Sequence, residues 1–399
     1  MIRRTLASAL GAGTLVVAAL AAGVPAASAV GHGASGRHAE RVCSAATAKT
    51  TASCFSKVMV NGKGAVPHSS TPPPGAKTPA QLKSAYNLNG TSGAGRTVAI
   101  VDAYGYPNLA ADLATYRNQF GLGSCTTASG CLRITDQNGG TSLPRFNAGW
   151  AGEQALDVDA VSAICPDCKI LVVQAKSASI ADLGTAANTA AHQAGVVAIS
   201  NSYGGGDLSD ATYGANYNHP GIAVTASTGD NGYQGGSFPA SSSYVTAVGG
   251  TTLVSASNSR GWSETAWSGA GSGCSTVNTA LAAAAGAGTG CSKRAIADVS
   301  AAADPNNGGM AVYYPTSQSV STWAQVGGTS ESSPIIASVY ALSGNTAGYA
   351  NALPYSHTAS LFDVSSGSNG TCPTTQWCNA RAGWDGPTGL GTPNGTGAF

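Results

Sequence analysis

The chain has 399 residues, of which 9% are charged, and its formal net charge is +1. So low and balanced a charge gives no electrostatic basis for binding nucleic acid. Its 54 glycines, with abundant small polar residues, indicate a core rich in small side chains and long surface loops.

The N-terminal residues have the pattern of an export signal. Arg3 and Arg4 precede the uncharged apolar stretch 6–24, and Ala27-Ser28-Ala29 is typical of a cleavage site. Glycines within the stretch favour a removable signal over an anchor, and no later segment is apolar enough to span a membrane. We therefore expect residues 1–29 to be removed and the protein to be secreted and extracellular.

Residues 30–74 differ in composition from the rest of the chain. Residues 30–74 are polar and short, and they end in the Ser- and Pro-rich run 69–74, which predicts an extended linker. From about residue 77 to residue 399 the texture is uniform and shows no internal repeat. These residues are enough for one large domain with a substantial core.

Within that domain, short apolar runs alternate with helical patterns. In chain order they predict a strand at 98–101, helices at 109–120 and 153–164, a strand at 170–173, a helix at 179–194, and strands at 196–199, 222–225 and 244–248. Continuous apolar strands separated by helices favour an α/β fold with a doubly wound, mostly parallel sheet and helices on both faces. Ligand sites in such sheets lie beyond the carboxyl ends of the strands, where Asp102, Tyr203 and Asp230 are predicted.

All ten cysteines lie beyond the predicted cleavage site, an even count that suits an oxidising compartment. The simplest pairing joins near neighbours, although spacing alone leaves the connectivity open. The pairs would be Cys43–Cys54, Cys125–Cys131, Cys165–Cys168, Cys274–Cys291 and Cys372–Cys378. The Cys165–Cys168 pair could instead be a redox or zinc site, but no second Cys-x-x-Cys and no histidine cluster accompanies it.

A glycine turn delivers a serine to the start of a helix near the C-terminus. Gly327-Gly328-Thr329-Ser330 precedes the apolar run 335–342, and Pro334 is expected in the first turn, where a missing N–H costs nothing. A serine held there is accessible to a substrate, and nearby backbone N–H groups can receive an oxyanion. The alternative is a loop with an ordinary N-cap.

A nucleophilic serine needs a base, and the histidines do not supply an evident one. None of the six stands in a setting that marks a general base. Glu153 and Asp157 lie four apart on a predicted helix and hence on one face, beside apolar residues. Burial there would raise a carboxyl pKa and let the two share a proton, although a solvated helix face is the alternative. A carboxylate, unlike an imidazole, still accepts protons near pH 4–5.

Four motifs resemble those of the sedolisins, or serine-carboxyl peptidases, secreted relatives of the subtilisin fold that work in acid. The similarity covers essentially residues 78–399. The motifs are Gly152-Glu153-x-x-Leu156-Asp157, Ala226-Ser227-Thr228-Gly229-Asp230, Gly327-Gly328-Thr329-Ser330-x-Ser332-Ser333-Pro334, and Phe362-Asp363-Val364 with Gly383-Trp384-Asp385-Gly386-Pro387-Thr388-Gly389-Leu390-Gly391.

The resemblance implies a serine-type endopeptidase that cleaves peptide bonds through an acyl-enzyme, with tripeptidyl-peptidase activity as another mode. Ser330 would be the nucleophile and Glu153 its base, with Asp157 orienting Glu153. Asp230 would be a protonated acid that donates a hydrogen bond to the oxyanion. A neutral donor and a carboxylate base both imply an acidic optimum.

The resemblance also implies one structural Ca²⁺ ion. The carboxylates of Asp363 and Asp385 and the backbone carbonyls of Val364, Arg381 and Gly383 would be its ligands. A pair of ordinary loop aspartates is the alternative interpretation of these residues.

The sequence also gives expectations for substrate binding and domain organisation. Ser202, Tyr203 and Gly204 are expected to pair with an extended peptide substrate. Residues 30–77 are a short pro-segment and linker before a peptidase domain at 78–399, where the family carries a long pro-domain. We expect a monomer that binds no nucleic acid.

Two other functions remain open from the sequence. A subtilisin-type hydrolase would use Asp102, Ser330 and a histidine such as His192 or His219. A secreted binding protein would keep the scaffold without catalysis, although binding does not require Glu153, Asp157, Asp230 and Ser330 together.

Overall fold

The computed structural model describes residues 1–2, 36–345 and 347–399. Residues 36–399 form one compact unit, so residues 36–77 pack with the rest of the peptidase-like region. The predicted signal, residues 1–29, lies outside the described residues except for its first two. The division into a pro-segment and linker at 30–77 and a peptidase domain at 78–399 stays a prediction. No helix in the described part of the chain is long and apolar enough to cross a bilayer.

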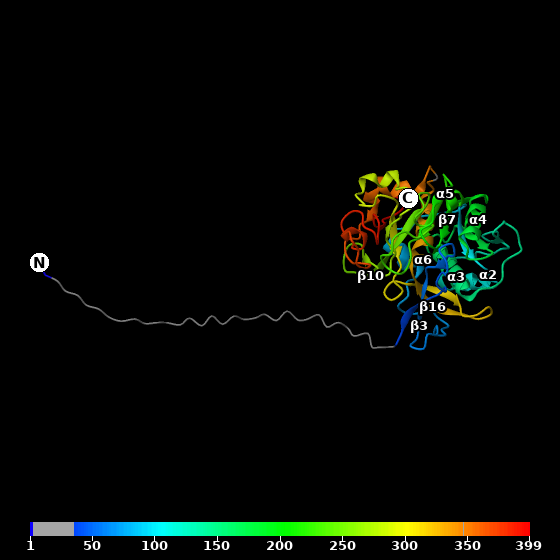
Figure 1. Cartoon of the computed structure of the whole chain (residues 1–399). Helices are drawn as coiled ribbons and strands as arrows, with labels where there is room; N and C mark the ends of the chain where they lie inside the picture. The colour runs from blue at the N-terminus through cyan, green and yellow to red at the C-terminus, as the bar shows by residue number, and fades with distance from the viewer. Residues whose placement is uncertain (3–35, 346) are drawn as a thin grey trace. The chain divides into compact units, whose positions relative to one another are not determined.

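The central element is a mostly parallel sheet (Figure 1). Its neighbours pair in parallel from β10 through to β5, β14 joins β10 in parallel, and β11 pairs antiparallel with β10. In spatial order the strands are β11 (Trp262–Ala266), β10 (Thr246–Ser255), β9 (Ala223–Ser227), β7 (Val196–Asn201), β4 (Thr97–Ala103), β6 (Lys169–Ala175) and β5 (Leu132–Asp136), with β14 (Val299–Ala302) beside β10.

Helices cover both faces of this sheet. Successive residues of β4 enter different cores: Val98 and Ile100 pack on one side, and Ala99 and Val101 on the other. The first core includes α3 and α6, and the second includes α4. The α-helices are α1 (Pro79–Ala85), α2 (Leu109–Phe120), α3 (Ala148–Ile164), α4 (Ile180–Ala191), α5 (Asp210–Tyr213), α6 (Thr329–Ser343) and α7 (Leu353–Ser356). The alternation explains why the strands are apolar on both sides.

A second sheet contains strands from the two ends of the sequence. β3 pairs antiparallel with both β1 and β16, and β16 leads directly into α6. Its order is β1 (His38–Arg41), β3 (Lys57–Val60), β16 (Ser321–Gly327) and β15 (Met310–Pro315). The short pairs are β2 (Ser53–Cys54) with β8 (Tyr203–Gly204), β12 (Gly273–Cys274) with β13 (Ala295–Ile296), and β17 (Leu361–Phe362) with β18 (Thr392–Pro393). The 3₁₀ turns are η1 (Gly214–Asn216), η2 (Ala282–Gly286), η3 (Ala350–Ala352), η4 (Thr358–Ser360) and η5 (Thr375–Trp377).

The predicted α/β fold class is confirmed, with shifted boundaries. The helix predicted at 153–164 begins at Ala148, because the Asn147 side chain caps it by accepting the N–H of Trp150. The prediction that Pro334 lies in the first turn is wrong, since α6 begins at Thr329 and Pro334 lies beyond that turn. Pro334 has no N–H to donate to the carbonyl of Ser330, and the Ser202 hydroxyl oxygen lies 3.3 Å from that carbonyl oxygen.

The expected disulfide pairing is confirmed. All five bridges join the neighbouring cysteines that the spacing suggested. Cys165 and Cys168 are bonded to each other, so their thiolates do not form a metal site with Asp167.

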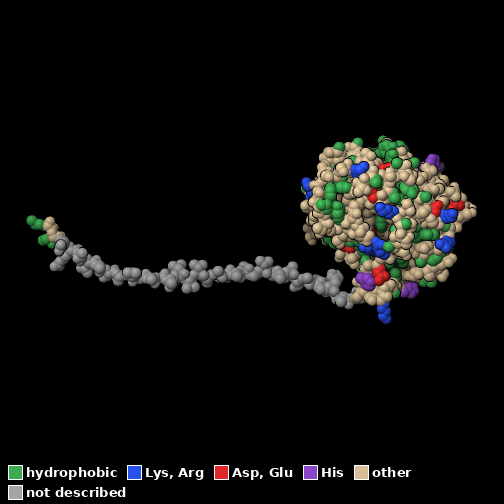
Figure 2. Space-filling model, in the orientation of Figure 1, with side chains coloured by type: hydrophobic (Ala, Val, Ile, Leu, Met, Phe, Trp, Pro, Cys, Tyr) green, Lys and Arg blue, Asp and Glu red, His purple; other side chains and the backbone are tan. Residues whose placement is uncertain are grey.

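The visible face of the molecule is largely uncharged (Figure 2).

Candidate active site

Ser330 stands at the second position of α6, immediately beyond β16. The connecting residue, Gly328, has φ 109°, and a Cβ there would lie 2.2 Å from the carbonyl oxygen of Phe55. Only glycine tolerates both constraints. The turn therefore aims the Ser330 hydroxyl and its backbone N–H at the same small space.

Three buried carboxyl groups surround this point. Glu153 and Asp157 lie on α3 and Asp102 lies near the carboxyl end of β4, and each is 0% exposed. Burial raises the pKa of all three, and the Asp102 charge raises the pKa of Glu153 and Asp157 further. These three carboxyl groups therefore keep their protons to higher pH than exposed carboxyl groups do.

Ser202, which follows β7, connects this set to the serine. Its hydroxyl donates to Asp157 Oδ1 at 2.8 Å, and its carbonyl accepts from Ser330 Oγ at 3.0 Å. Glu153 is close enough for the Ser330 hydroxyl to lower its pKa. Its Oε2 accepts instead from the Ser56 hydroxyl, and among the described residues its Oε1 has no hydrogen-bond partner. Glu153 therefore lies beside the Ser330 hydroxyl while it is hydrogen-bonded to Ser56.

Asp230 follows β9 and faces the N-terminus of α6. Its Oδ1 accepts from the Thr329 N–H at 2.8 Å, whereas Oδ2 has no hydrogen-bond partner within the described chain. Burial raises the pKa of Asp230 to about 7, and the Lys57 charge opposes that rise. A protonated Oδ2 could therefore donate a hydrogen bond beside the Ser330 N–H.

The predicted catalytic residues Glu153, Asp157, Asp230 and Ser330 are thus brought together. The residues predicted to pair with a substrate, Ser202 to Gly204, also lie here. In this structure they pair with the chain's own N-terminal segment, where Cys54 opposes Tyr203 and Ser53 opposes Gly204. The sequence reasoning placed Asp102 at this edge of the sheet, but it did not place the N-terminal segment in the site. The apolar run 58–60 within a polar region was a signal for a strand there.

The described histidines all bond elsewhere. His192 Nδ1 contacts the carbonyl of Asn188, His219 Nε2 contacts that of Asn216, and His357 Nδ1 contacts that of Leu353. His38 contacts Glu40 and His68 contacts Thr322. His32 is outside the described residues. The geometry gives no support to the subtilisin-type alternative.

Comparison with known proteins accords with this site. Kumamolisin from Bacillus sp. (strain MN-32) is 31% identical over 362 residues, covering 81% of this chain and 63% of kumamolisin. The structure of a Pseudomonas sedolisin, described as a serine-carboxyl proteinase complexed with pseudo-iodotyrostatin, superposes with a TM-score of 0.66 at 25% identity. That match covers 80% of this chain and 95% of the sedolisin chain.

The chain is homologous to kumamolisin and sedolisin, and its structure matches that of sedolisin. Tripeptidyl-peptidase sed1 from Aspergillus fumigatus is a more distant relative, 27% identical over 230 residues, which are 44% of this chain and 34% of that protein. No family model matches the chain. The match with this chain spans 63% of the length of kumamolisin. The likeness to sedolisin confirms the predicted subtilisin-like architecture.

The residues predicted to hold calcium lie together in the C-terminal loops. Asp385 is 0% exposed, burial raises its pKa to about 7, and the Asp363 charge contributes to that rise. In the described part of the chain, no hydrogen bond reaches the carbonyl oxygens of Val364, Arg381 or Gly383. A buried acid beside a second carboxylate and three free carbonyls is a donor set that fits Ca²⁺.

Proposed function

We propose that the protein is a secreted serine-carboxyl peptidase that hydrolyses peptide bonds through an acyl-enzyme intermediate. The observation that supports this most is the buried Glu153 carboxyl beside the Ser330 hydroxyl, with every described histidine bonded elsewhere. A hydroxyl needs a base to become a nucleophile, and a carboxyl is the available one.

In this mechanism Glu153 takes the proton as Ser330 Oγ attacks the substrate carbonyl carbon. The raised pKa of Glu153 makes it a stronger base than an exposed glutamate, and Asp157 holds the shared proton and orients it. Glu153 then gives the proton to the leaving amine, and water hydrolyses the ester by the reverse route. The substrate backbone would pair with Ser202, Tyr203 and Gly204.

The oxyanion would lie between the Ser330 N–H and the neutral Asp230 carboxyl. Because Asp230 must be protonated to donate, the hole is complete below its pKa of about 7. Activity is therefore expected in acid and should fall towards alkaline pH.

We also propose one structural Ca²⁺ ion, held by Asp363, Asp385 and the carbonyls of Val364, Arg381 and Gly383. Its positive charge would offset the cost of ionising the buried Asp385 and tie the C-terminal loops together. Its role is stability, since the catalytic groups lie on other elements. The partners are peptide substrates, and the enzyme is expected to act as a monomer.

Peptide hydrolysis by the wild type and Ser330→Ala, measured between pH 3 and 8 on a mixed peptide pool, tests the proposal. We expect acidic activity that is lost in the variant, and the products will separate endopeptidase from tripeptidyl-peptidase cleavage. Undiminished activity in Ser330→Ala would remove the serine from its role. No hydrolysis by either form would favour a binding protein on the same scaffold.

A further inference from the structure

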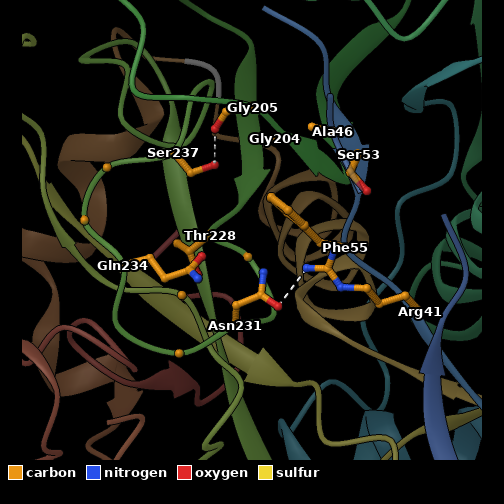
Figure 3. Close-up of a pocket in the computed structure, with 15 residues that line it drawn as sticks. Arg41, Ala46, Ser53, Phe55, Gly204, Gly205, Thr228, Asn231, Gln234 and Ser237 are labelled. Atoms are coloured by element: carbon orange, nitrogen blue, oxygen red, sulfur yellow. Dashed lines mark hydrogen bonds between the residues drawn. The ribbon is translucent and has the colours of Figure 1, made fainter. Parts of the chain in front are cut away.

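Ser202 lies between the buried acids and the substrate cleft. It follows β7 and immediately precedes β8, the strand that pairs with the N-terminal segment. Gly204 of β8 lines a cavity of about 280 Å³ together with Phe55 (Figure 3). The Ser202 side chain is 0% exposed and its hydroxyl bonds to Asp157 on α3, so the hydroxyl faces the acids and not the cavity.

The Ser202 hydroxyl has one proton to donate and two acceptors within reach. Asp157 Oδ1 lies 2.8 Å from it, and the carbonyl oxygen of Ser330 lies 3.3 Å from it. Because hydrogen bonds between oxygens are strongest at the shorter distance, the hydroxyl donates to Asp157. An Oδ1 atom that accepts this hydrogen bond leaves Oδ2 as the oxygen that holds the proton when Asp157 is neutral.

The other oxygens of the three acids depend on one another for hydrogen bonds. In the described part of the chain, Asp157 Oδ2, Glu153 Oε1 and both side-chain oxygens of Asp102 are buried without a hydrogen-bond partner. Burial raises the pKa of Asp157, and the charges of Asp102 and Glu153 raise it further. Buried carboxyl oxygens need donors, and protons retained on these carboxyl groups are the donors at hand. A proton on Asp157 Oδ2 is one of them.

Three further titratable groups surround the acids: Tyr203 on β8, Asp230 after β9 and Tyr314 on β15. Burial and the Asp102 charge raise the pKa of Glu153, and the Asp230 charge adds to that rise. Burial raises the pKa of Tyr314, and the Glu153 charge adds to it. The Tyr203 hydroxyl donates to Asn201 Oδ1. Within the described chain, the Ser202 hydroxyl is therefore the one hydrogen-bond donor to the Asp157 carboxyl group.

The backbone of the same residue directs the nucleophile. The Ser202 carbonyl oxygen accepts a hydrogen bond from Ser330 Oγ at 3.0 Å. Ser202 thus holds the second acid through its hydroxyl and the nucleophile through its carbonyl. Because Ser202→Ala removes the hydroxyl and keeps the carbonyl, this substitution separates the two roles.

We propose that Ser202 is a positioning residue whose hydroxyl keeps the proton of Asp157 on Oδ2, from which it is donated to Glu153. The inference rests on the proposed function. A hydrogen bond from Asp157 stabilises the ionised Glu153 and orients it towards Ser330. Glu153 takes the serine proton during the attack and gives it to the leaving amine, while the Asp157 proton stays with the two acids. Without the Ser202 hydroxyl, the Asp157 proton can also stand on Oδ1, where Glu153 does not receive it.

The first test compares peptide hydrolysis by the wild type, Ser202→Ala and Ser200→Ala between pH 3 and 8. Ser200 is a matched control, because it is equally buried and its hydroxyl contacts Ser333 at 2.9 Å rather than an acid. We expect Ser202→Ala to lower kcat by about 10–100-fold with KM unchanged. Burial raises the pKa of Asp157 and the Ser202 hydrogen bond opposes that rise, so its loss should move the acidic limb of kcat/KM to higher pH. Ser200→Ala should keep the wild-type kcat and pH profile.

The outcomes separate this inference from the proposed function. A raised KM with unchanged kcat in Ser202→Ala would assign the residue to substrate binding and overturn the inference. Equal losses in Ser202→Ala and Ser200→Ala would indicate lost packing and overturn it as well. Wild-type kinetics in Ser202→Ala, with Ser330→Ala inactive, would overturn the inference alone. Full activity in Ser330→Ala would overturn the proposed function too.

A double-mutant cycle tests whether Ser202 acts through Asp157. In an Asp157→Ala background, Ser202→Ala should lower kcat by less than about twofold, because the proton that it positions is gone. Ser202→Cys keeps a weaker donor of similar size, so its kcat should lie between those of the wild type and Ser202→Ala. The same fold loss for Ser202→Ala in the wild-type and Asp157→Ala backgrounds would contradict the inference.

Discussion

The backbone carbonyl of Phe55 accepts a hydrogen bond from the backbone N–H of Ser330, 275 residues further along the chain. This contact places a peptide group against the predicted nucleophile. The residues around the Phe55 side chain therefore indicate where the side chain of a bound peptide would lie. The glycines that border the Phe55 ring are then determinants of the residue preceding the cleaved bond.

Gly204→Ala should change this preference. The added Cβ would lie 2.4 Å from Ser237 Oγ and 2.6 Å from the Phe55 ring, so it would narrow the space that the ring occupies. We expect kcat/KM for peptides with phenylalanine before the cleaved bond to fall by about 10–200-fold relative to peptides with alanine there. Gly286→Ala is a matched control, because its Cβ would meet nothing within 4 Å. Equal losses for both peptides would show that Gly204 does not border the specificity pocket.

Asp230 should set the alkaline limit of activity. Its pKa is raised to about 7, so it is a neutral donor below that pH and an anion above it. Asp230→Ala should lower kcat by about 10²–10³-fold. Asp230→Asn keeps an acceptor for the Thr329 N–H and a donor at all pH values, so it should retain more activity and lose the fall near pH 7. The same fall in Asp230→Asn would exclude Asp230 as its cause.

Asp102 should affect the pKa of the proposed base, Glu153. Its charge raises the pKa of Glu153 and Asp157, so Asp102→Asn should lower the pKa of both. Glu153 must be ionised to accept a proton, and the acidic limb of kcat/KM should therefore move to lower pH. Asp112→Asn serves as a control, because Asp112 contacts Tyr106 and Ser321 and not the base. If the acidic limb of kcat/KM stays at the same pH in Asp102→Asn, Asp102 does not affect the pKa of the catalytic carboxyl groups.

Calcium removal should destabilise the protein more at neutral than at acidic pH. Without an ion, burial raises the pKa of Asp385 to about 7, so its ionisation costs stability as pH rises from its ordinary value towards 7. A bound cation offsets this cost by about 2.7 kcal/mol at one hundred times its Kd. We expect a chelator to lower Tm by several degrees near pH 7 and little near pH 4. Asp363→Asn should shrink the difference, whereas an identical chelator effect at both pH values would argue against ionised ligands.

Much of the fold follows from local patterns in the sequence. The run 98–101 predicted β4, and the spacing of Leu109, Leu113 and Tyr116 predicted α2 with its left-handed Gly121 end. The start of α3 was missed because Gly149 and Gly152 interrupt the helical composition before Glu153. Both glycines are close to neighbouring groups, with Gly152 facing the Tyr314 ring, so they reflect packing rather than helix preference.

The site was predictable in part. The spacing of Glu153 and Asp157 on one helix face, next to apolar residues, indicated that both could be buried. The contact of Phe55 with Ser330 has no such local signal, because it depends on how distant strands meet. The charge coupling of Asp102 to α3 likewise depends on the sheet order, which periodicity does not specify.

The central claim is that a carboxylate, and not an imidazole, activates Ser330. The most direct measurement is the peptide hydrolysis rate, from pH 3 to 8, of the wild type, Glu153→Gln and the double variant His192→Ala/His219→Ala. We predict that Glu153→Gln loses about 10²–10⁴-fold in kcat while the histidine variant keeps the wild-type rate and pH profile. Retained activity in Glu153→Gln, with loss in the histidine variant, would contradict the account.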